Sequence, residues 1–150
     1  MKTDTAEYHF KRSYKITPAQ LWHLLTDPQQ REQWGAPGPD MVLTAETSDL
    51  RVGGSERHRC GPADAPEFIV DTRWYRLDTA ALAAFTETLI IGDDAMATSL
   101  VTYALAATED GVDLAVTVAV SSFTGPEAPS EFHHGWEGGL ANLDALIAAL

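Results

Sequence analysis

Three side chains that could do chemistry stand at alternate positions of one short stretch: the carboxyl group of Glu56, the imidazole of His58 and the thiol of Cys60. Alternate residues of a strand share a face, so all three would point the same way. A carboxyl group and an imidazole inside an apolar cavity could transfer protons, because burial shifts the pKa values of both. If the two pair, the carboxylate would favour the protonated imidazole and give a ligand carbonyl or hydroxyl group a polar handle.

Glu56 and His58 are the candidate catalytic residues, but we expect them to form a hydrogen-bonded lining that orients a ligand. The nucleophile, base and orienting group of a catalytic set do not occur together in the sequence. A slip of one residue in the register of the strand would instead expose all three side chains. Cys60 is predicted to be a small buried side chain rather than a nucleophile. This stretch therefore favours binding over catalysis.

The spacing of the other reactive residues does not support metal or cofactor chemistry. His133 and His134 are adjacent on an expected helix, so their side chains should point in different directions and not serve as a metal pair. The zinc-site spacings HxxxH, HExxH and CxxC do not occur. The same holds for the nucleotide-binding patterns GxGxxG, GxxxxGKS and GxxxxGKT, and for the GxSxG pattern of hydrolases. We expect no metal and no cofactor.

Composition limits the remaining functions. The 150 residues have the usual size of one domain, which we place over residues 1–150, and 45% of them are hydrophobic. The formal net charge of −12 repels phosphate backbones and anionic lipids, so we expect no binding to nucleic acid or to a membrane. No secretory signal or membrane-length apolar run occurs, and the single cysteine permits no internal disulfide. These features predict a cytoplasmic protein.

Two short helices in tandem are predicted near the N-terminus. Thr17 can cap a helix whose third residue, Gln20, closes a capping box, and Asp27 can cap a second helix directly afterwards. The second helix must end just past Trp34, because Gly35 and the prolines that follow do not continue a helix. A large aromatic residue therefore stands at a helix end, before a rigid loop.

Seven strands are predicted from segments with a period of two. Phe85, Glu87 and Leu89 share one face, and Asp110-Gly111 is a favoured hairpin turn between two of the strands. Short turns join the strands, so we expect a strongly bent antiparallel meander. The expected strands are one through residues 8–14, two within 41–59, and one each at 68–77, 85–90, 100–107 and 112–120.

The chain should end in a long helix. From residue 130 onward, apolar residues recur at intervals of three and four, which predicts a helix of about twenty residues and about 30 Å. Gly135, Gly138 and Gly139 cost such a helix about 1 kcal/mol each relative to alanine. We expect these glycines where the helix approaches the sheet closely or leaves room beside Trp136.

The order of these elements and their motifs resembles the family related to the activator of Hsp90 ATPase, within the START/Bet v 1-like superfamily. The resemblance covers essentially the whole chain and is specific to the family rather than to an activity. Two departures are Gly35, where the family often has an aromatic residue, and "SERHRC" over 55–60, where it usually has an aromatic-rich strand. The matching residues are Arg12 with Tyr14, Pro18, Leu21-Trp22, "LTDPQQREQW" over 25–34, "DLRVGG" over 49–54, and Gly135-Trp136 followed by Leu140 and Leu143.

The resemblance implies an α+β fold of the helix-grip type. In that fold a curved antiparallel sheet of about seven strands wraps a long C-terminal helix, with two short helices after the first strand. A cavity between sheet and helix is the expected ligand site, although Trp34 could instead plug the interior and leave no usable pocket. The residues expected to line the cavity are Trp34, His58, Phe68, Trp74, Phe85, Trp136 and Leu140.

Three functions from different classes fit this fold. The first is non-catalytic binding of a small hydrophobic or aromatic molecule, which we favour because ligand sites are usually apolar concavities. The second is an enzyme of the polyketide cyclase/aromatase type that uses the same cavity. The third is a protein-interaction module linked to chaperones and the stress response. The third has least support, because the chain carries only the one domain, without the extra N-terminal domain of true co-chaperones. The sequence leaves a homodimer open.

Overall fold

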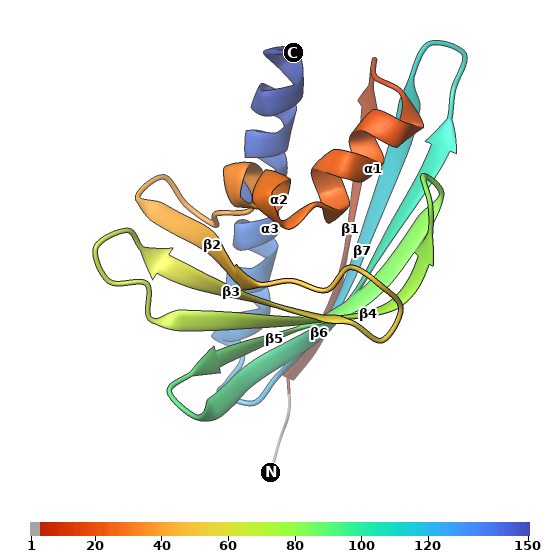
Figure 1. Cartoon of the computed structure of the whole chain (residues 1–150). Coiled ribbons are helices and arrows are strands. Elements are labelled where there is room, and N and C mark those ends of the chain that lie inside the picture. The colour runs from red at the N-terminus through yellow and green to blue at the C-terminus, as the bar shows by residue number, and fades with distance from the viewer. Residues whose placement is uncertain (1–3) are drawn as a thin grey trace.

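The computed structural model describes residues 4–150 and has an α+β helix-grip fold (Figure 1). Seven antiparallel strands form one curved sheet in the order β1-β7-β6-β5-β4-β3-β2. Two short helices follow the first strand and a long helix ends the chain, as predicted. The elements are β1 (Asp4–Tyr14), α1 (Pro18–Thr26), α2 (Pro28–Trp34), β2 (Met41–Thr47), β3 (Ser55–Pro62), β4 (Phe68–Asp78), β5 (Leu82–Ile91), β6 (Asp94–Ala107), β7 (Val112–Ser122) and α3 (Glu127–Ala148).

Both predicted helix starts are confirmed. Thr17 accepts a hydrogen bond from the N–H of Gln20 at 3.1 Å, and the Gln20 side chain accepts one from the N–H of Thr17 at 2.9 Å. This reciprocal capping box fixes the start of α1. Asp27 caps α2 by accepting a hydrogen bond from the N–H of Gln30, and that helix ends at Trp34. Residues three apart on a helix are neighbours, so α2 presents Arg31 and Trp34 together.

The hairpin predicted around Asp110-Gly111 is confirmed. β6 and β7 are paired along their whole shared length, and the last pair before the turn joins Ala107 to Val112. β6 begins earlier than predicted, at Asp94, where it follows β5 through another short turn. The extra residues lengthen the sheet at the end away from α1, which is where the cavity described below lies.

The long helix α3 packs on the inner face of the sheet against β1 and β7, with α2 beside it (Figure 1). Trp136 and Leu143 are buried in this contact, as predicted. The helix begins at Glu127, before the predicted start at residue 130. No helix among residues 4–150 is long and apolar enough to cross a membrane.

The glycines of α3 allow a close approach, but to α2 and its loop rather than to the sheet. A Cβ atom at Gly138 would lie 2.9 Å from the carbonyl oxygen of Pro37, and one at Gly139 would lie 3.3 Å from that of Trp34. Any larger side chain would push the end of α2 away from α3. Gly138 and Gly139 therefore let the end of α2 pack against α3, and the close approach is not the one to the sheet that was the first of the two alternatives.

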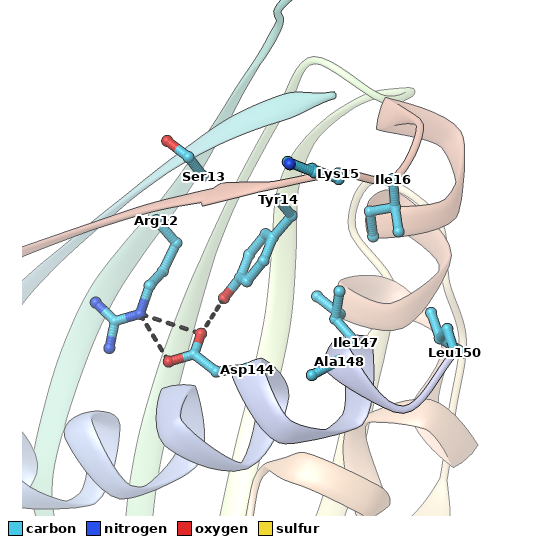
Figure 2. Close-up of a pocket in the computed structure, with 9 residues that line it drawn as sticks. All are labelled: Arg12, Ser13, Tyr14, Lys15, Ile16, Asp144, Ile147, Ala148 and Leu150. Atoms are coloured by element: carbon cyan, nitrogen blue, oxygen red, sulfur yellow. Dashed lines mark hydrogen bonds and ion pairs between the residues drawn. The ribbon is translucent and has the colours of Figure 1, made fainter. Parts of the chain in front are cut away.

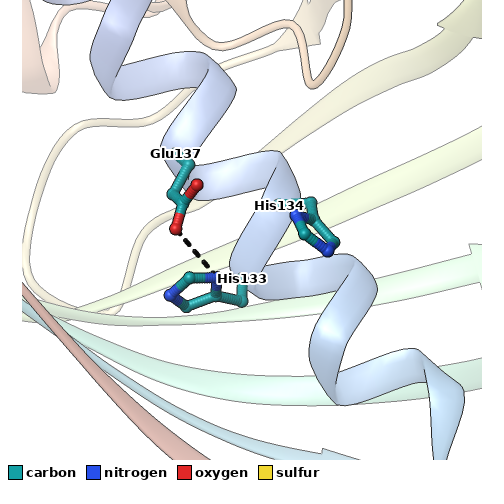
Figure 3. Close-up of side chains that lie close together, drawn as sticks. All are labelled: His133, His134 and Glu137. Carbon is teal, nitrogen blue, oxygen red and sulfur yellow. Dashed lines mark ion pairs between the residues drawn. The ribbon is translucent and has the colours of Figure 1, made fainter.

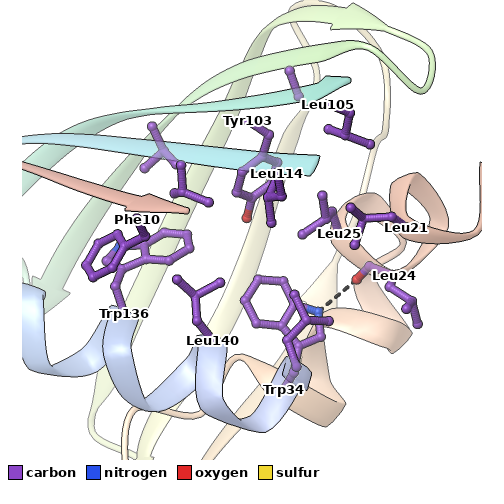
Figure 4. Packing of buried hydrophobic residues seen from close by; sticks show 14 of the residues in the cluster. Phe10, Leu21, Leu24, Leu25, Trp34, Tyr103, Leu105, Leu114, Trp136 and Leu140 are labelled. Atoms are coloured by element: carbon purple, nitrogen blue, oxygen red, sulfur yellow. Dashed lines mark hydrogen bonds between the residues drawn. The ribbon is translucent and has the colours of Figure 1, made fainter. Parts of the chain in front are cut away.

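One end of the interior, next to α1, is packed solid, and we call it the closed end (Figure 4). Trp34 is buried there and donates its indole N–H to the carbonyl oxygen of Leu24 at 2.8 Å. Phe85 packs between Trp74 and Tyr103, with ring centroids 4.8 and 5.1 Å away. Leucines from α1 and branched residues from β6 and β7 complete this core.

A polar contact ties the C-terminal half of α3 to the first strand. Tyr14 donates its hydroxyl hydrogen to Asp144 at 2.6 Å, and Arg12 approaches the same carboxylate at 3.2 Å (Figure 2). Burial and then the hydrogen bond to Asp144 raise the pKa of Tyr14, so the hydroxyl group stays a donor at neutral pH. The contact holds the helix at the closed end of the molecule.

Candidate ligand cavity

A cavity of about 450 Å³ lies between the inner face of the sheet, α2 and the first half of α3. Small-molecule sites typically have volumes of this order. The cavity opens to solvent beside Ile91, Thr124 and Glu131, which are exposed. Its wall is mostly apolar: Trp34, Gly35, Pro37, Met41, Leu43, Cys60, Phe68, Val70, Leu89, Ile91, Met96, Ala97, Thr124, Ala128, Phe132, Gly135, Trp136 and Gly139, with Arg31, Glu87 and Glu131 as its charged members.

The structure divides the predicted lining residues into two groups. One group lies in the wall of the cavity: Trp34, Phe68 and Trp136. The other group is buried outside that wall: His58, Trp74, Phe85 and Leu140. Trp74, Phe85 and Leu140 fill the closed end, because their positions along the strands and α3 lie nearer to α1. Whether the first group contacts a ligand stays a prediction.

A row of buried polar side chains crosses four neighbouring strands and separates the cavity from the closed end. Glu56 on β3 pairs with Thr72 on β4, Thr72 with Glu87 on β5, and Glu87 with Ser99 on β6. All four are buried, and we call them the polar row. On one side of this row Trp74 and Phe85 pair within the closed end. On the other side the wall of the cavity begins.

Arg31 lies over the polar row from α2. Its guanidinium carbon is 4.6 Å from the ring centroid of Trp34 and 5.2 Å from that of Trp136, so the two indoles stack on it. Nη2 pairs with Glu87 Oε2 at 3.4 Å, and Nη1 donates to the hydroxyl oxygen of Tyr103 at 3.5 Å. Both contacts are long, and Nε has no hydrogen-bond partner. The guanidinium group has five N–H donors, so it can donate to a further acceptor.

The carboxyl group of Glu56 titrates near neutrality. Burial raises its pKa to about 7, against the smaller opposing effects of the indole N–H of Trp74 and the charge of Arg31. One of its oxygens, Oε1, has no hydrogen-bond partner. Burial likewise raises the pKa of the Cys60 thiol to about 11. Cys60 is thus a protonated, buried side chain, as predicted, while Glu56 exchanges a proton in the neutral range.

His58 is neutral. Burial and then the charge of Arg31 lower the pKa of His58 to about 4. Its Nε2 has no hydrogen-bond partner, and no ion pair joins it to Glu56 within the described part of the chain. The condition for a protonated imidazole, a direct pair with the Glu56 carboxylate, is therefore not met. The reason is that desolvation penalises both charges and no direct contact offsets it.

Two residues that line the polar part of the cavity were missed in the sequence. Glu87 shares a strand face with Phe85 and Leu89, a pattern that already indicated an inward carboxylate. Arg31 stands three residues before Trp34 on a short helix, which places both on one face. A charged residue at an inward-facing position indicates a buried ion pair, since unpaired buried charges are rare.

A second group of reactive side chains lies on α3 (Figure 3). The ligand atoms of His133, His134 and Glu137 all lie within 4.8 Å of one another, and His133 Nδ1 is 3.1 Å from a Glu137 oxygen. The centroids of the two imidazole rings are 6.0 Å apart and the rings are tilted at 78° to each other, so the side chains still point in different directions although their ligand atoms are close. His133 also packs on the rings of Tyr8 and Phe10. We assign no metal here, and the absence of a metal site stays a prediction.

A curved antiparallel sheet that grips a long C-terminal helix above an apolar cavity defines the helix-grip proteins of the START/Bet v 1-like superfamily. Within that class, the family model described as "Activator of Hsp90 ATPase homolog 1-like protein" matches residues 15–148. The chain belongs to this family, as its motifs predicted. No curated protein matches it.

Solved structures with the same fold come from several bacteria. A protein from Rhizobium loti is 24% identical, with a TM-score of 0.81 over 97% of this chain and 99% of the other. An uncharacterized protein from Rhizobium leguminosarum is 21% identical, with a TM-score of 0.80 over 99% and 98%. An AHSA1 protein from Silicibacter pomeroyi is 20% identical, with a TM-score of 0.76 over 96% and 99%. At these identities the likeness is one of fold alone.

Proposed function

We propose that this protein binds a small hydrophobic or aromatic molecule in the cavity and does not transform it. The observation that carries the proposal is the apolar, aromatic-walled cavity of about 450 Å³ that opens to solvent. Proteins of this superfamily typically bind hydrophobic ligands. The single, buried cysteine, Cys60, supports a cytoplasmic setting.

The wall of the cavity favours binding over the cyclase/aromatase alternative. A group that moves protons must reach the reacting atoms within hydrogen-bond distance. Glu56 and His58, the candidates for that chemistry, are buried outside the wall, whereas Arg31 and Glu87 form its polar part. Arg31 and Glu87 form an ion pair, which suits holding a ligand better than exchanging its protons. A homodimer or a chaperone contact is not part of the proposal.

Native mass spectrometry of freshly purified protein, combined with titration of tryptophan fluorescence, tests this proposal. We expect a small-molecule adduct, or an emission change when apolar and aromatic compounds are added, because Trp34 and Trp136 lie in the wall. Trp74, in the closed end, should report little of it. The proposal fails if the protein carries no adduct and none of the compounds changes the emission.

A further inference from the structure

The polar part of the cavity wall is a charge-compensated pair. Arg31 and Glu87 are largely buried, with side chains 15% and 9% exposed, and they offset each other's charge. The third charged member of the wall, Glu131, is exposed at the mouth. A ligand that reaches the inner end of the cavity therefore meets no uncompensated charge. A charged group on the ligand would lose its hydration on entering the cavity and would gain no counter-ion there.

The same pair still has hydrogen-bonding capacity. Arg31 Nη1 and Nη2 each carry a second hydrogen beyond their contacts with Tyr103 and Glu87, so an acceptor atom of a ligand could use one of them. Glu87 uses Oε2 for the ion pair, which leaves Oε1 able to accept from a ligand donor. A group that both accepts and donates, and carries no charge, fits these two needs at once. A hydroxyl group is the simplest group of this kind.

The charges of Arg31 and Glu87 compensate each other, and the pair still offers a hydrogen-bond donor and an acceptor. We therefore infer that the cavity binds an uncharged aromatic alcohol. Its hydroxyl group lies between Arg31 and Glu87, and its ring system lies among the aromatic residues of the wall, including Phe68 and Phe132. This inference rests on the proposed function and names the ligand class of the same cavity. It excludes carboxylates, which would meet Glu87, and amines, which would meet Arg31.

Calorimetric titration at pH 7 with four compounds of one shape tests the inference. The compounds are 2-naphthol, naphthalene, 2-naphthoate and 2-naphthylmethylammonium. We expect 2-naphthol to bind about tenfold or more tightly than naphthalene, because it adds hydrogen bonds to charged partners. Both ions should bind more weakly than 2-naphthol by about tenfold or more.

The outcomes separate the inference from the proposed function. If naphthalene binds as tightly as 2-naphthol, or if either ion binds as tightly, the ligand class is wrong while the cavity remains a ligand site. If none of the four compounds binds, the inference fails, and the proposed function fails with it only if no adduct and no change of emission is found either. The unmodified protein serves for this comparison, so no result depends on whether a variant folds.

A charge-removing variant tests the role of compensation directly. Glu87→Gln keeps the shape of the side chain but leaves Arg31 without its counter-ion. Binding of 2-naphthoate should rise about tenfold relative to 2-naphthol, because Arg31 can now pair with the carboxylate. The control is Glu109→Gln, which removes the same charge at an exposed position beside the β6–β7 turn and should leave the ratio unchanged. An unchanged ratio in Glu87→Gln would overturn the inference.

Discussion

The two ends of the inner sheet face use the same strands and the same helix, yet one is packed solid and the other is hollow. At the closed end, Trp74, Phe85 and Tyr103 stack on one another, and α1 covers them with leucines. At the cavity end the equivalent strand positions carry smaller residues such as Val70 and Ala97. The polar row lies between the two ends.

This contrast shows that side-chain size, together with the positions of the helices, decides where the fold leaves space. α1 covers the closed end, and α2 stops at Trp34, so at the cavity end α2 and α3 border the space without filling it. The glycines of α3 bring α2 close without adding volume. The polar row marks the boundary, since Trp74 pairs with Phe85 on one side of it and Val70 pairs with Leu89 on the other. The predictions below test each side of this boundary.

The largest effect should come from breaking the ion pair at the boundary. Arg31→Leu leaves Glu87 buried without its counter-ion, which should lower the free energy of unfolding by about 3–5 kcal/mol. Urea denaturation followed by circular dichroism measures this change. The double variant Arg31→Leu/Glu87→Leu should lose less than Arg31→Leu alone, because no uncompensated charge is left. Additive losses in the double variant would show that the two residues do not act as a pair.

A similar but pH-dependent effect is expected at Glu56. Its pKa is raised from 4.5 to about 7 in the folded protein, so the unfolded chain loses its proton first as pH rises. The stability that this group contributes is therefore lost between about pH 4.5 and 7, by about 3 kcal/mol in all. Glu56→Gln should raise the free energy of unfolding by about that amount at pH 8 and leave it unchanged at pH 4.

Denaturation of both proteins across that pH range checks the Glu56 prediction. Glu109→Gln is the matched control, because Glu109 is exposed, and it should change the free energy of unfolding by less than about 0.5 kcal/mol at each pH. A stabilisation by Glu56→Gln that is the same at pH 4 and pH 8 would mean that ionisation of Glu56 is not its cause.

Two alanines, each fully buried, compare the two regions directly. Ala83 lies in the closed end and Ala97 lies in the wall of the cavity. Ala83→Leu should overpack the core and cost about 1–3 kcal/mol without changing the affinity for 2-naphthol. Ala97→Leu should cost less than about 1 kcal/mol, because the added atoms enter empty volume, and should weaken 2-naphthol binding about tenfold. Equal costs at the two sites would remove the distinction between a packed and a hollow end.

The smallest effect should come from the cap of α2. Asp27→Ala removes the hydrogen bond from the side chain to the N–H of Gln30, which is 3.1 Å long, and should cost about 1 kcal/mol. Because α2 carries Arg31 and Trp34, ligand affinity should fall slightly with it. Asp27→Asn keeps an acceptor at the cap and should retain most of the stability. A loss as large in Asp27→Asn as in Asp27→Ala would point to the charge of Asp27 rather than to its capping bond.

The fold was readable from local signals. The capping box of Thr17 and Gln20, the turn at Asp110-Gly111 and the apolar period of α3 each correspond to a hydrogen-bond pattern that a few neighbouring residues determine. Together with the family motifs they predicted the order of all the elements. The ends of β6 and α3 were less predictable, because their extra residues are stabilised by pairing and packing with distant segments.

The site was only partly readable. The alternation of residues along the strand correctly placed Glu56 and His58 on the inner face. It could not show which inner residues lie at the hollow end, since that depends on where α1 and α2 pack on the sheet. The charge state of His58 stayed conditional in the sequence, because it depends on desolvation and on Arg31, which approaches from another element. The Arg31–Glu87 pair joins residues far apart in the chain, so only the folded structure brings it together.

A crystal structure of the protein with 6-bromo-2-naphthol tests the central claim most directly, because the anomalous signal of bromine places the ligand without ambiguity. We predict a single strong bromine peak inside the cavity toward Ile91 and Glu131 at the mouth, with the hydroxyl oxygen within hydrogen-bond distance of an Arg31 Nη atom and of Glu87. A cavity that is filled by its own side chains, with bromine found only on the outer surface, would contradict the account.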